Sequence, residues 1–331
     1  MCYPLKILVI PPVSRTLPPL GYGGTQRVCW ALTDGIFRLG HHIMLAAMKG
    51  STPHHLPLIS VPMRPDLKPS KRFLKRFARL LRRTFPYSFD VISTHGSSAY
   101  LSEFFPNTPI VNTMHGGFGE RILDTDIPVF VSQAQKKHYL ITYPHLKDSQ
   151  VIYNPINMSE FKFRQEKEDY LLFIAKLDWR DKGIDPAIEI ARRTKHRLIL
   201  AGPNLQKEHR DILDERLEYA GEVYGEQKAE LLANAKAVLM PSRLPEAFGL
   251  VAAEANASGT PAIVLNNGAM PEVVNHNETG FVCNSVDEMA QAVHSLSSIK
   301  PKRCEEWVRQ NFDHHLISKQ TIDYYYTLVA P

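Results

Sequence analysis

Short apolar runs of the kind that form β-strands alternate with helix-like stretches along this chain, and the alternation restarts near the middle. The first series of runs extends from 6–10 to 151–153, and the second from 170–174 to 281–282. The runs between these limits are 43–47, 91–94, 110–112 and 129–131 in the first series, and 197–201, 217–220, 238–240 and 261–265 in the second. Strands that alternate with helices form parallel sheets, and 331 residues exceed the usual size of one domain. The sequence therefore predicts an α/β protein with two Rossmann-like βαβ domains.

The domain boundaries follow from where the pattern pauses. We expect an N-terminal Rossmann-like domain over 1–155 and a C-terminal one over 170–312. A linker is predicted over 156–169, because Asn154-Pro155 precedes it and its end is strongly charged. Residues 313–331 have helical spacing and no strand after them, so they predict a closing helix that packs back on the N-terminal domain.

Composition excludes several classes of protein. The four cysteines are far apart in the sequence and form no CxxC pair, which indicates a reducing compartment and disfavours structural zinc. The first apolar run ends at Pro11-Pro12 after six residues, too short for a secretory signal, and no run reaches the eighteen residues of a membrane span. We therefore expect a cytoplasmic protein. The paired histidines at 41–42, 54–55 and 314–315 have no matching cysteines or acids at metal-binding spacing and are predicted to be surface features.

The stretch from Pro241 to Pro261 contains the most chemistry. It predicts a strand, a loop and an Ala-rich helix, with Glu246 just before the helix and Glu254 about two turns inside it, roughly 9–12 Å along the axis. The backbone N–H groups between them, those of Phe248, Gly249 and Leu250, can bind an anion or sugar hydroxyls.

Two other interpretations of the glutamates remain open at this point. Glu246 can complement the helix dipole while Glu254 is a surface residue. The two can also be the acid/base pair of a glycoside hydrolase, which requires carboxyl groups about 5–10 Å apart. Their position beside helix-terminal amides favours the binding of hydroxyls and phosphate.

This stretch resembles the E-x7-E signature of the retaining family 4 glycosyltransferases, which share the GT-B architecture of two Rossmann-like domains facing a central cleft. Five further stretches resemble motifs of that family, in the same order along nearly the whole chain. They are the glycine loop in 18–27, the strand-end histidine in 112–116, the basic pair in 176–183, the strand ends at 200–202 and 220–223, and the loop at 268–272.

The resemblance assigns roles to residues of both halves. His115 is expected to act beside the reacting carbon. Lys176 and Lys182 are expected to stabilise the leaving diphosphate, although the family commonly has Arg at the first position and Lys offers a point charge instead of a fork. Glu246 is expected to contact the transferred sugar and Glu254 the ribose. The other expected donor contacts are Gly23, Gly24, Gly202, Val223, Phe248, Gly249 and Leu250.

The implied reaction moves a sugar from a nucleoside diphosphate sugar to an acceptor hydroxyl with retention of configuration, without a cofactor. No metal ion is expected, because lysines and helix dipoles take its place. The glycines are not spaced as GxGxxG, which disfavours a dinucleotide-dependent oxidoreductase. A sugar-nucleotide epimerase of the same fold and a non-catalytic nucleotide-sugar-binding protein that docks on membranes are the alternatives.

Residues 64–85 concentrate the basic charge of the chain: their net charge is +8, so the remaining residues carry −3. Within them, 70–85 combine apolar residues at helical spacing with basic residues on the remaining positions. The basic positions are Lys71, Arg72, Lys75, Arg76, Arg79, Arg82 and Arg83. This composition is typical of a helix on an anionic membrane, here the inner face, and equally of a domain helix whose apolar stripe packs on a sheet. Arg72, Arg76 and the strand-end His95 are predicted acceptor contacts. No nucleic acid is expected as a partner.

Overall fold

The computed structural model describes residues 3–12, 15–19, 21, 23–53, 55–61, 70–84, 89–96 and 101–329. The chain folds into two compact units. Unit 1 comprises 1–131, 136–155 and 314–331, and unit 2 comprises 132–135 and 156–313. Each unit is built on a six-stranded parallel sheet, which confirms the predicted α/β fold of two Rossmann-like domains.

The sheet of unit 1 has the strand order β3-β2-β1-β4-β5-β6. Its strands are β1 (Lys6–Ile10), β2 (His42–Met48), β3 (Leu58–Val61), β4 (Val91–Thr94), β5 (Ile110–Met114) and β6 (Ile127–Phe130). Its helices are α1 (Gly24–Arg38), α2 (Lys71–Thr84), α3 (Leu101–Phe104), α12 (His314–Val329) and most of α4 (Gln133–Thr142). The sequence did not predict β3, and the strand predicted over 151–153 is only a single bridge between Val151 and Phe130.

Both faces of this sheet are covered, as the continuous apolar strands require. Alternate residues of β1 point to opposite faces. Ile7 and Val9 pack in a core with α1 and α12, and Leu8 and Ile10 pack in another with α2 and α3. The alternation of side chains along β1 therefore explains why both faces of the sheet need helices to cover them.

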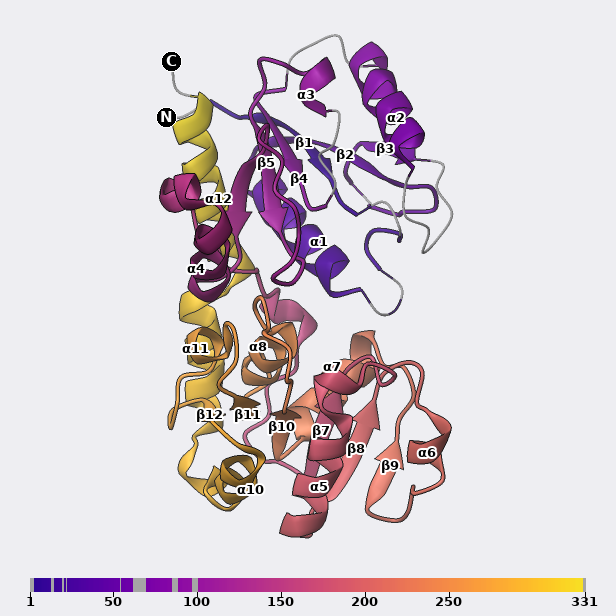
Figure 1. Cartoon of the computed structure of the whole chain (residues 1–331), viewed down its shortest axis with the longest axis vertical. Helices are drawn as coiled ribbons and strands as arrows, with labels where there is room; N and C mark the ends of the chain where they lie inside the picture. Colours follow the sequence, from indigo (N-terminus) through magenta and orange to yellow (C-terminus); the bar gives the residue numbers. More distant parts are fainter. Residues whose placement is uncertain are drawn as a thin grey trace. The chain divides into compact units, whose positions relative to one another are not determined.

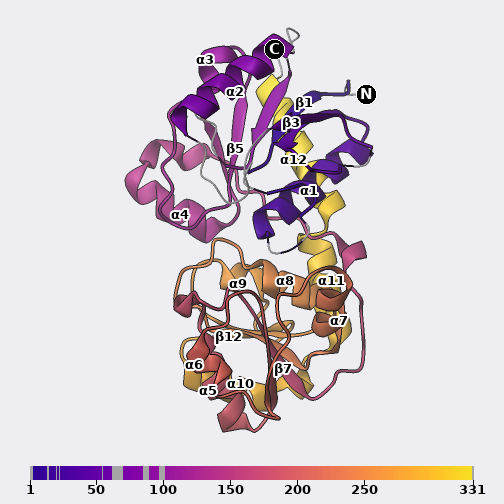
Figure 2. The same ribbon diagram turned by 90° about the vertical axis from the view of Figure 1, so that its right-hand side faces the viewer.

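Helix α12, the last element of the chain, packs along α1 in unit 1 (Figures 1 and 2). The two helices approach closely at Gly35 of α1, where an added Cβ would collide with the Ser318 side chain. Ile317 and Tyr325 of α12 are almost fully buried. A larger residue at position 35 would therefore require Ser318 and the facing part of α12 to shift.

The sheet of unit 2 has the strand order β12-β11-β10-β7-β8-β9. Its strands are β7 (Tyr170–Ile174), β8 (Arg197–Ala201), β9 (Leu217–Tyr219), β10 (Ala237–Met240), β11 (Ala262–Leu265) and β12 (Gly280–Cys283). Its helices are α5 (Ile184–Thr194), α6 (Lys207–Arg210), α7 (Gly225–Asn234), α8 (Leu250–Ala257), α9 (Met270–Val273), α10 (Val286–His294) and α11 (Pro301–Asn311). Apolar residues of α5 and α10 cover one face of the sheet, and those of α7 and α8 cover the other.

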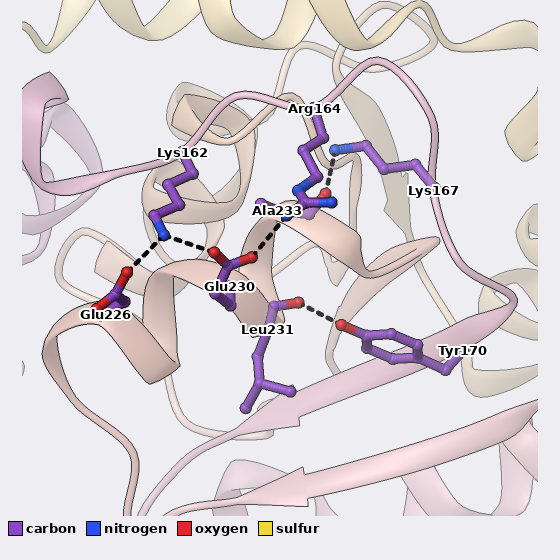
Figure 3. A network of polar contacts seen from close by, with 8 residues as sticks. All are labelled: Lys162, Arg164, Lys167, Tyr170, Glu226, Glu230, Leu231 and Ala233. Carbon is purple, nitrogen blue, oxygen red and sulfur yellow. Dashed lines mark hydrogen bonds and ion pairs between the residues drawn. The ribbon is translucent and has the colours of Figure 1, made fainter.

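The segment expected as a linker, 156–169, is part of unit 2 and is attached to α7 (Figure 3). Lys162 donates to Glu226 at 2.8 Å and to Glu230 at 2.5 Å. Lys167 donates to the backbone carbonyl of Ala233, near the end of α7, at 2.7 Å. Its other acceptors are the Ser258 carbonyl and the Thr260 hydroxyl. Burial lowers the pKa of Lys167 to about 8. The charged run thus binds helix ends, where carbonyls lack intrahelical partners.

Candidate functional site

Glu246 lies in the loop between β10 and α8, and a second loop fixes its backbone. The Glu246 carbonyl accepts a hydrogen bond from the Ala269 amide at 2.9 Å, and Glu246 forms a parallel bridge with Gly268. Gly268 has φ +61°, and an added Cβ there would collide with the Glu246 backbone. The loop at 268–272, singled out in the sequence, therefore positions the first signature glutamate.

Lys182 makes an ion pair with the Glu246 carboxylate. Its Nζ lies 2.7 Å from Oε1, and the two side chains are 24% and 14% exposed. The ammonium also lies 5.1 Å from the centre of the Trp179 ring, close enough for a cation–π contact. Gly183, with φ +92°, lets this loop approach the Pro241 carbonyl, with which any Cβ would collide. The structure thus brings together one predicted lysine and one predicted glutamate in a partly desolvated setting.

The other basic residues of this loop are less enclosed. Lys176 is 43% exposed, and its Nζ lies 3.6 Å from Asp178. Arg180 is paired with Glu208 at 2.5 Å on the surface. Among the basic residues of this loop, Lys182 is therefore the best-held cation.

Glu254 is buried in α8, 5% exposed, which excludes the interpretation that it is a surface residue. Its Oε2 accepts a hydrogen bond from Lys228 Nζ at 2.5 Å. Lys228 comes from α7 and is 14% exposed. Sequence reasoning missed Lys228, because nothing local distinguishes it from a solvated helix lysine. Both signature glutamates therefore have a lysine partner.

The start of α8 retains unused hydrogen-bond donors. Gly249 caps the helix with φ +101°, and the amides of Gly249 and Leu250 donate to no acceptor in the described part of the chain. The Phe248 side chain is buried and meets the Phe312 ring edge to face at 5.3 Å. Phe248 can thus serve a ligand only through its backbone.

The strand ends expected near the donor base are tightly packed. Gly202 follows β8, donates to the Gly221 carbonyl at 2.7 Å and accepts from the Tyr219 hydroxyl at 3.0 Å. Val223 is buried in the core beside Leu232. Any contact of Val223 with a base would accordingly involve its backbone.

In unit 1, the strand-end histidines form a pair. His95, after β4, is only 2% exposed, and its Nδ1 lies 2.8 Å from Nε2 of His115, which follows β5. The rings are stacked with 17° between their planes. Burial lowers the pKa of His115 to about 4, with a side-chain hydrogen bond between His115 and Asn154 opposing it, and burial also holds the pKa of His95 well below its usual range. Both rings are therefore neutral at pH 7.

The histidine pair is connected to α12. Ser93 of β4 lies 3.5 Å from His95 Nε2 and accepts a hydrogen bond from the Tyr325 hydroxyl at 2.8 Å. A small pocket beside His115 is lined by Tyr325, Thr113, Asn154 and apolar side chains of α1 and α12. Sequence alone placed His95 and His115 at strand ends, but it could not show that they touch.

The glycine loop of unit 1 leads into α1. Gly23 is the residue before the helix and Gly24 is its first residue. The Gly23 backbone is extended, with φ 164°, and its missing Cβ leaves room for Pro19 and Gln26. The side chain of Arg27 donates to the Gly21 carbonyl at 3.2 Å.

The basic residues predicted over 70–85 lie on helix α2. Arg72 and Arg76 are exposed, as are the other five basic residues predicted on this helix. Phe77, Ala78 and Leu81 pack in the core of unit 1, so much of the apolar stripe is occupied by the protein itself, although Leu80 is 51% exposed. Phe85 lies outside the described residues.

Two expectations about metal-type residues need correction. His41 and His314 are buried instead of superficial, and His41 Nδ1 accepts a hydrogen bond from the Leu5 amide at 3.1 Å; His54 lies outside the described residues. An acid does adjoin one histidine pair, because ligand atoms of Asp313, His314 and His315 lie within 4.8 Å of one another. These three consecutive residues are at the start of α12, and no fourth ligand joins the cluster in the described part of the chain.

The chain also contains one Asp-x-Asp sequence, Asp124 and Asp126, a spacing that can bind a divalent ion. Asp126 is buried and accepts a hydrogen bond from Asn112 at 3.1 Å, whereas Asp124 is exposed.

Family models match both halves of the chain. Residues 156–313 match the glycosyl transferases group 1 model, and residues 22–160 match the glycosyltransferase family 4 model. The chain belongs to the group 1 glycosyltransferases and is of the family 4 type. The fold is accordingly GT-B, as predicted.

Relatives and solved structures agree with the family. An uncharacterized glycosyltransferase of Methanocaldococcus jannaschii is 30% identical over 46% of this chain and 45% of its own length. The chain thus spans about half the length of the first curated relatives it matches. A crystal structure of a glycosyltransferase involved in avilamycin A biosynthesis superposes with a TM-score of 0.79 at 26% identity, covering 99% of this chain and 98% of that one. An Anabaena protein crystallised with UDP-glucose has a TM-score of 0.75 at 17% identity, covering 96% and 99%.

Proposed function

We propose that the protein transfers a sugar from a nucleoside diphosphate sugar to an acceptor hydroxyl. The observation that carries this proposal is the set of groups at the β10–α8 loop: the Lys182–Glu246 pair and the unused amides of Gly249 and Leu250. A partly buried cation and helix-terminal amides together bind a diphosphate and stabilise the charge that develops as it leaves. The Anabaena protein of the same fold binds UDP-glucose.

In this proposal, unit 2 binds the donor. Glu254 holds the ribose, Glu246 contacts the transferred sugar, and Lys182, with the more exposed Lys176, contacts the diphosphate. His115 contacts the sugar beside the reacting carbon as a neutral imidazole. Retention of configuration is proposed through attack on the same face as the leaving diphosphate, which takes up the acceptor proton. The lysines and amides supply the positive charge, so no metal ion is required.

The test is release of nucleoside diphosphate from UDP-, GDP- and ADP-sugars, measured with and without a panel of sugar, lipid-linked and small-molecule acceptors. Acceptor-dependent release that survives EDTA supports the proposal. Conversion of the donor sugar without an acceptor would instead indicate an epimerase. Binding of a donor without turnover would indicate a binding protein, and activity that EDTA abolishes and Mn²⁺ restores would contradict the role of the lysines.

We also propose that the exposed basic face of α2 contacts an anionic membrane or a lipid-linked acceptor. Seven basic residues are exposed on this helix, among them Lys75, which is paired with Glu103 of α3 at 2.9 Å. Each basic residue near an anionic surface contributes about 1 kcal/mol. No helix of the described residues is long and apolar enough to cross a bilayer.

A further inference from the structure

The Lys228–Glu254 pair is the most enclosed of the ion pairs at the candidate donor site. The two side chains are 14% and 6% exposed, against 24% and 14% for Lys182 and Glu246. An ion pair taken out of water is costly unless its remaining hydrogen-bonding positions are also used. A ligand that used those remaining positions would offset part of this cost.

The pair leaves complementary positions for a ligand. Glu254 Oε2 accepts from Lys228, but Oε1 accepts no hydrogen bond from the described residues. The Lys228 ammonium has three N–H donors, and Glu254 is its acceptor within the same described part of the chain. One acceptor oxygen and two N–H donors thus remain at a single buried pair.

The Glu254 side chain also points towards the N-terminal end of α8, where the unused amides lie. Glu254 follows Leu250 by one helical turn, so the two lie on the same face of the helix. Helical side chains point back towards the helix N-terminus. The Glu254 carboxylate is therefore directed towards the turn that contains the unused amides of Gly249 and Leu250.

We propose that Lys228 and Glu254 together recognise one ribose hydroxyl of the nucleoside diphosphate. That hydroxyl donates its proton to Glu254 Oε1 and accepts a hydrogen bond from Lys228 Nζ. Lys228 is thus a residue that determines specificity for ribose, in addition to neutralising Glu254. This inference rests on the proposed function, because it requires a nucleoside diphosphate to bind unit 2.

The experiment measures dissociation constants by calorimetry. UDP, GDP and ADP are first compared on the wild-type protein, and the nucleotide that binds most tightly is then compared with its 2′-deoxy and 3′-deoxy analogues. We expect at least about a 10-fold loss of affinity for one of the two analogues, because a site built to hydrogen-bond a hydroxyl rejects a ligand that lacks it. In Lys228→Met, the dissociation constants of that deoxy analogue and of the parent nucleotide should agree within about twofold.

Lys228→Arg separates recognition from a merely structural role. An Arg fork binds a carboxylate through both oxygens, so it preserves the ion pair but occupies Oε1. The inference therefore expects Lys228→Arg to fold like the wild type and still to lose discrimination between ribose and the deoxyribose. If the Lys228–Glu254 pair is only structural and no ribose hydroxyl binds Oε1, Lys228→Arg should discriminate as the wild type does.

Lys162→Met is the matched control, because Lys162 pairs with Glu226 and Glu230 on the same helix, α7, at an exposed place (Figure 3). This variant should keep the wild-type ratio. If the wild type binds none of the three nucleotides, the proposed function and this inference both fail. If the wild type binds but does not discriminate, or if Lys228→Arg keeps full discrimination, only the inference fails.

Discussion

The two units place different chemistry at the carboxyl ends of their sheets. Unit 2 has two lysine–glutamate pairs, Lys182–Glu246 and Lys228–Glu254, with side chains between 6% and 24% exposed. Unit 1 has two stacked imidazoles, His95 and His115, which burial keeps neutral. The same parallel α/β architecture thus presents charge in one unit and uncharged donors and acceptors in the other.

This difference suits the two units to different parts of a ligand. Lysines near carboxylates can exchange partners with a diphosphate, whose charge they match. A neutral imidazole can donate to or accept from a sugar hydroxyl without attracting the diphosphate. The comparison predicts that substitutions in unit 2 alter steps that depend on charge and have large effects. Substitutions in unit 1 should alter steps that do not depend on charge and have smaller effects.

The largest expected effect is from Glu246→Gln. The substitution removes the negative charge that pairs with Lys182 and one charged hydrogen bond to the transferred sugar, for which about 1.5–3 kcal/mol is typical. Turnover should therefore fall about 10- to 150-fold in the diphosphate-release assay. Glu226→Gln, which changes an exposed glutamate of α7, is the control and should retain activity. A loss below twofold for Glu246→Gln would remove the Lys182–Glu246 pair from the mechanism.

His115→Ala should have a smaller effect. A neutral hydrogen bond contributes about 0.5–1.5 kcal/mol, so we expect turnover to fall about 2- to 13-fold while the affinity for the nucleoside diphosphate is unchanged. Circular dichroism should show a folded protein. If turnover is unaffected, His115 has a structural role only, and the functional contrast between the units is wrong.

The neutral histidine pair predicts a pH effect on stability. The pKa of each ring is lower in the folded protein than in the unfolded chain, so the unfolded chain takes up protons first as the pH falls. The contribution of the neutral pair to the free energy of unfolding is complete above about pH 6.5, the usual His pKa. It is lost as the pH falls towards about 4. We expect the melting temperature of the wild type to fall more between pH 7 and 4.5 than that of the His95→Asn/His115→Asn variant. Parallel curves would show that the pair is not responsible.

The smallest and most salt-sensitive effect concerns α2. Because Phe77, Ala78 and Leu81 are buried in unit 1, binding to anionic liposomes should be mainly electrostatic and should weaken steeply with ionic strength. Reversal of Arg72, Arg76, Arg79 and Arg83 to Glu should abolish co-sedimentation, with neutral liposomes as the control. If the wild type ignores anionic liposomes at low salt and the reversed variant transfers sugar as before, α2 is only a structural helix.

The sequence determined the repeating pattern of strands and helices, the E-x7-E stretch and the strand-end positions of His95 and His115, because periodicity and loop position are local properties. It missed β3, a four-residue edge strand, and overestimated 151–153, because so short a run is decided by the neighbours with which it pairs. It gave Lys176 and Lys182 equal roles, although the fold encloses only Lys182.

Only the tertiary structure decided which polar groups meet. Lys228 and Glu254 lie 26 residues apart, and Tyr325 and Ser93 lie 232 apart. No spacing rule connects such pairs, since their contact depends on how helices pack on the sheet. The apolar stripe of α2 was likewise ambiguous in sequence, because the same hydrophobic pattern suits a membrane or a core. Burial of Phe77 and Leu81 assigns much of that stripe to the core, and packing of the helix against the sheet is the physical reason.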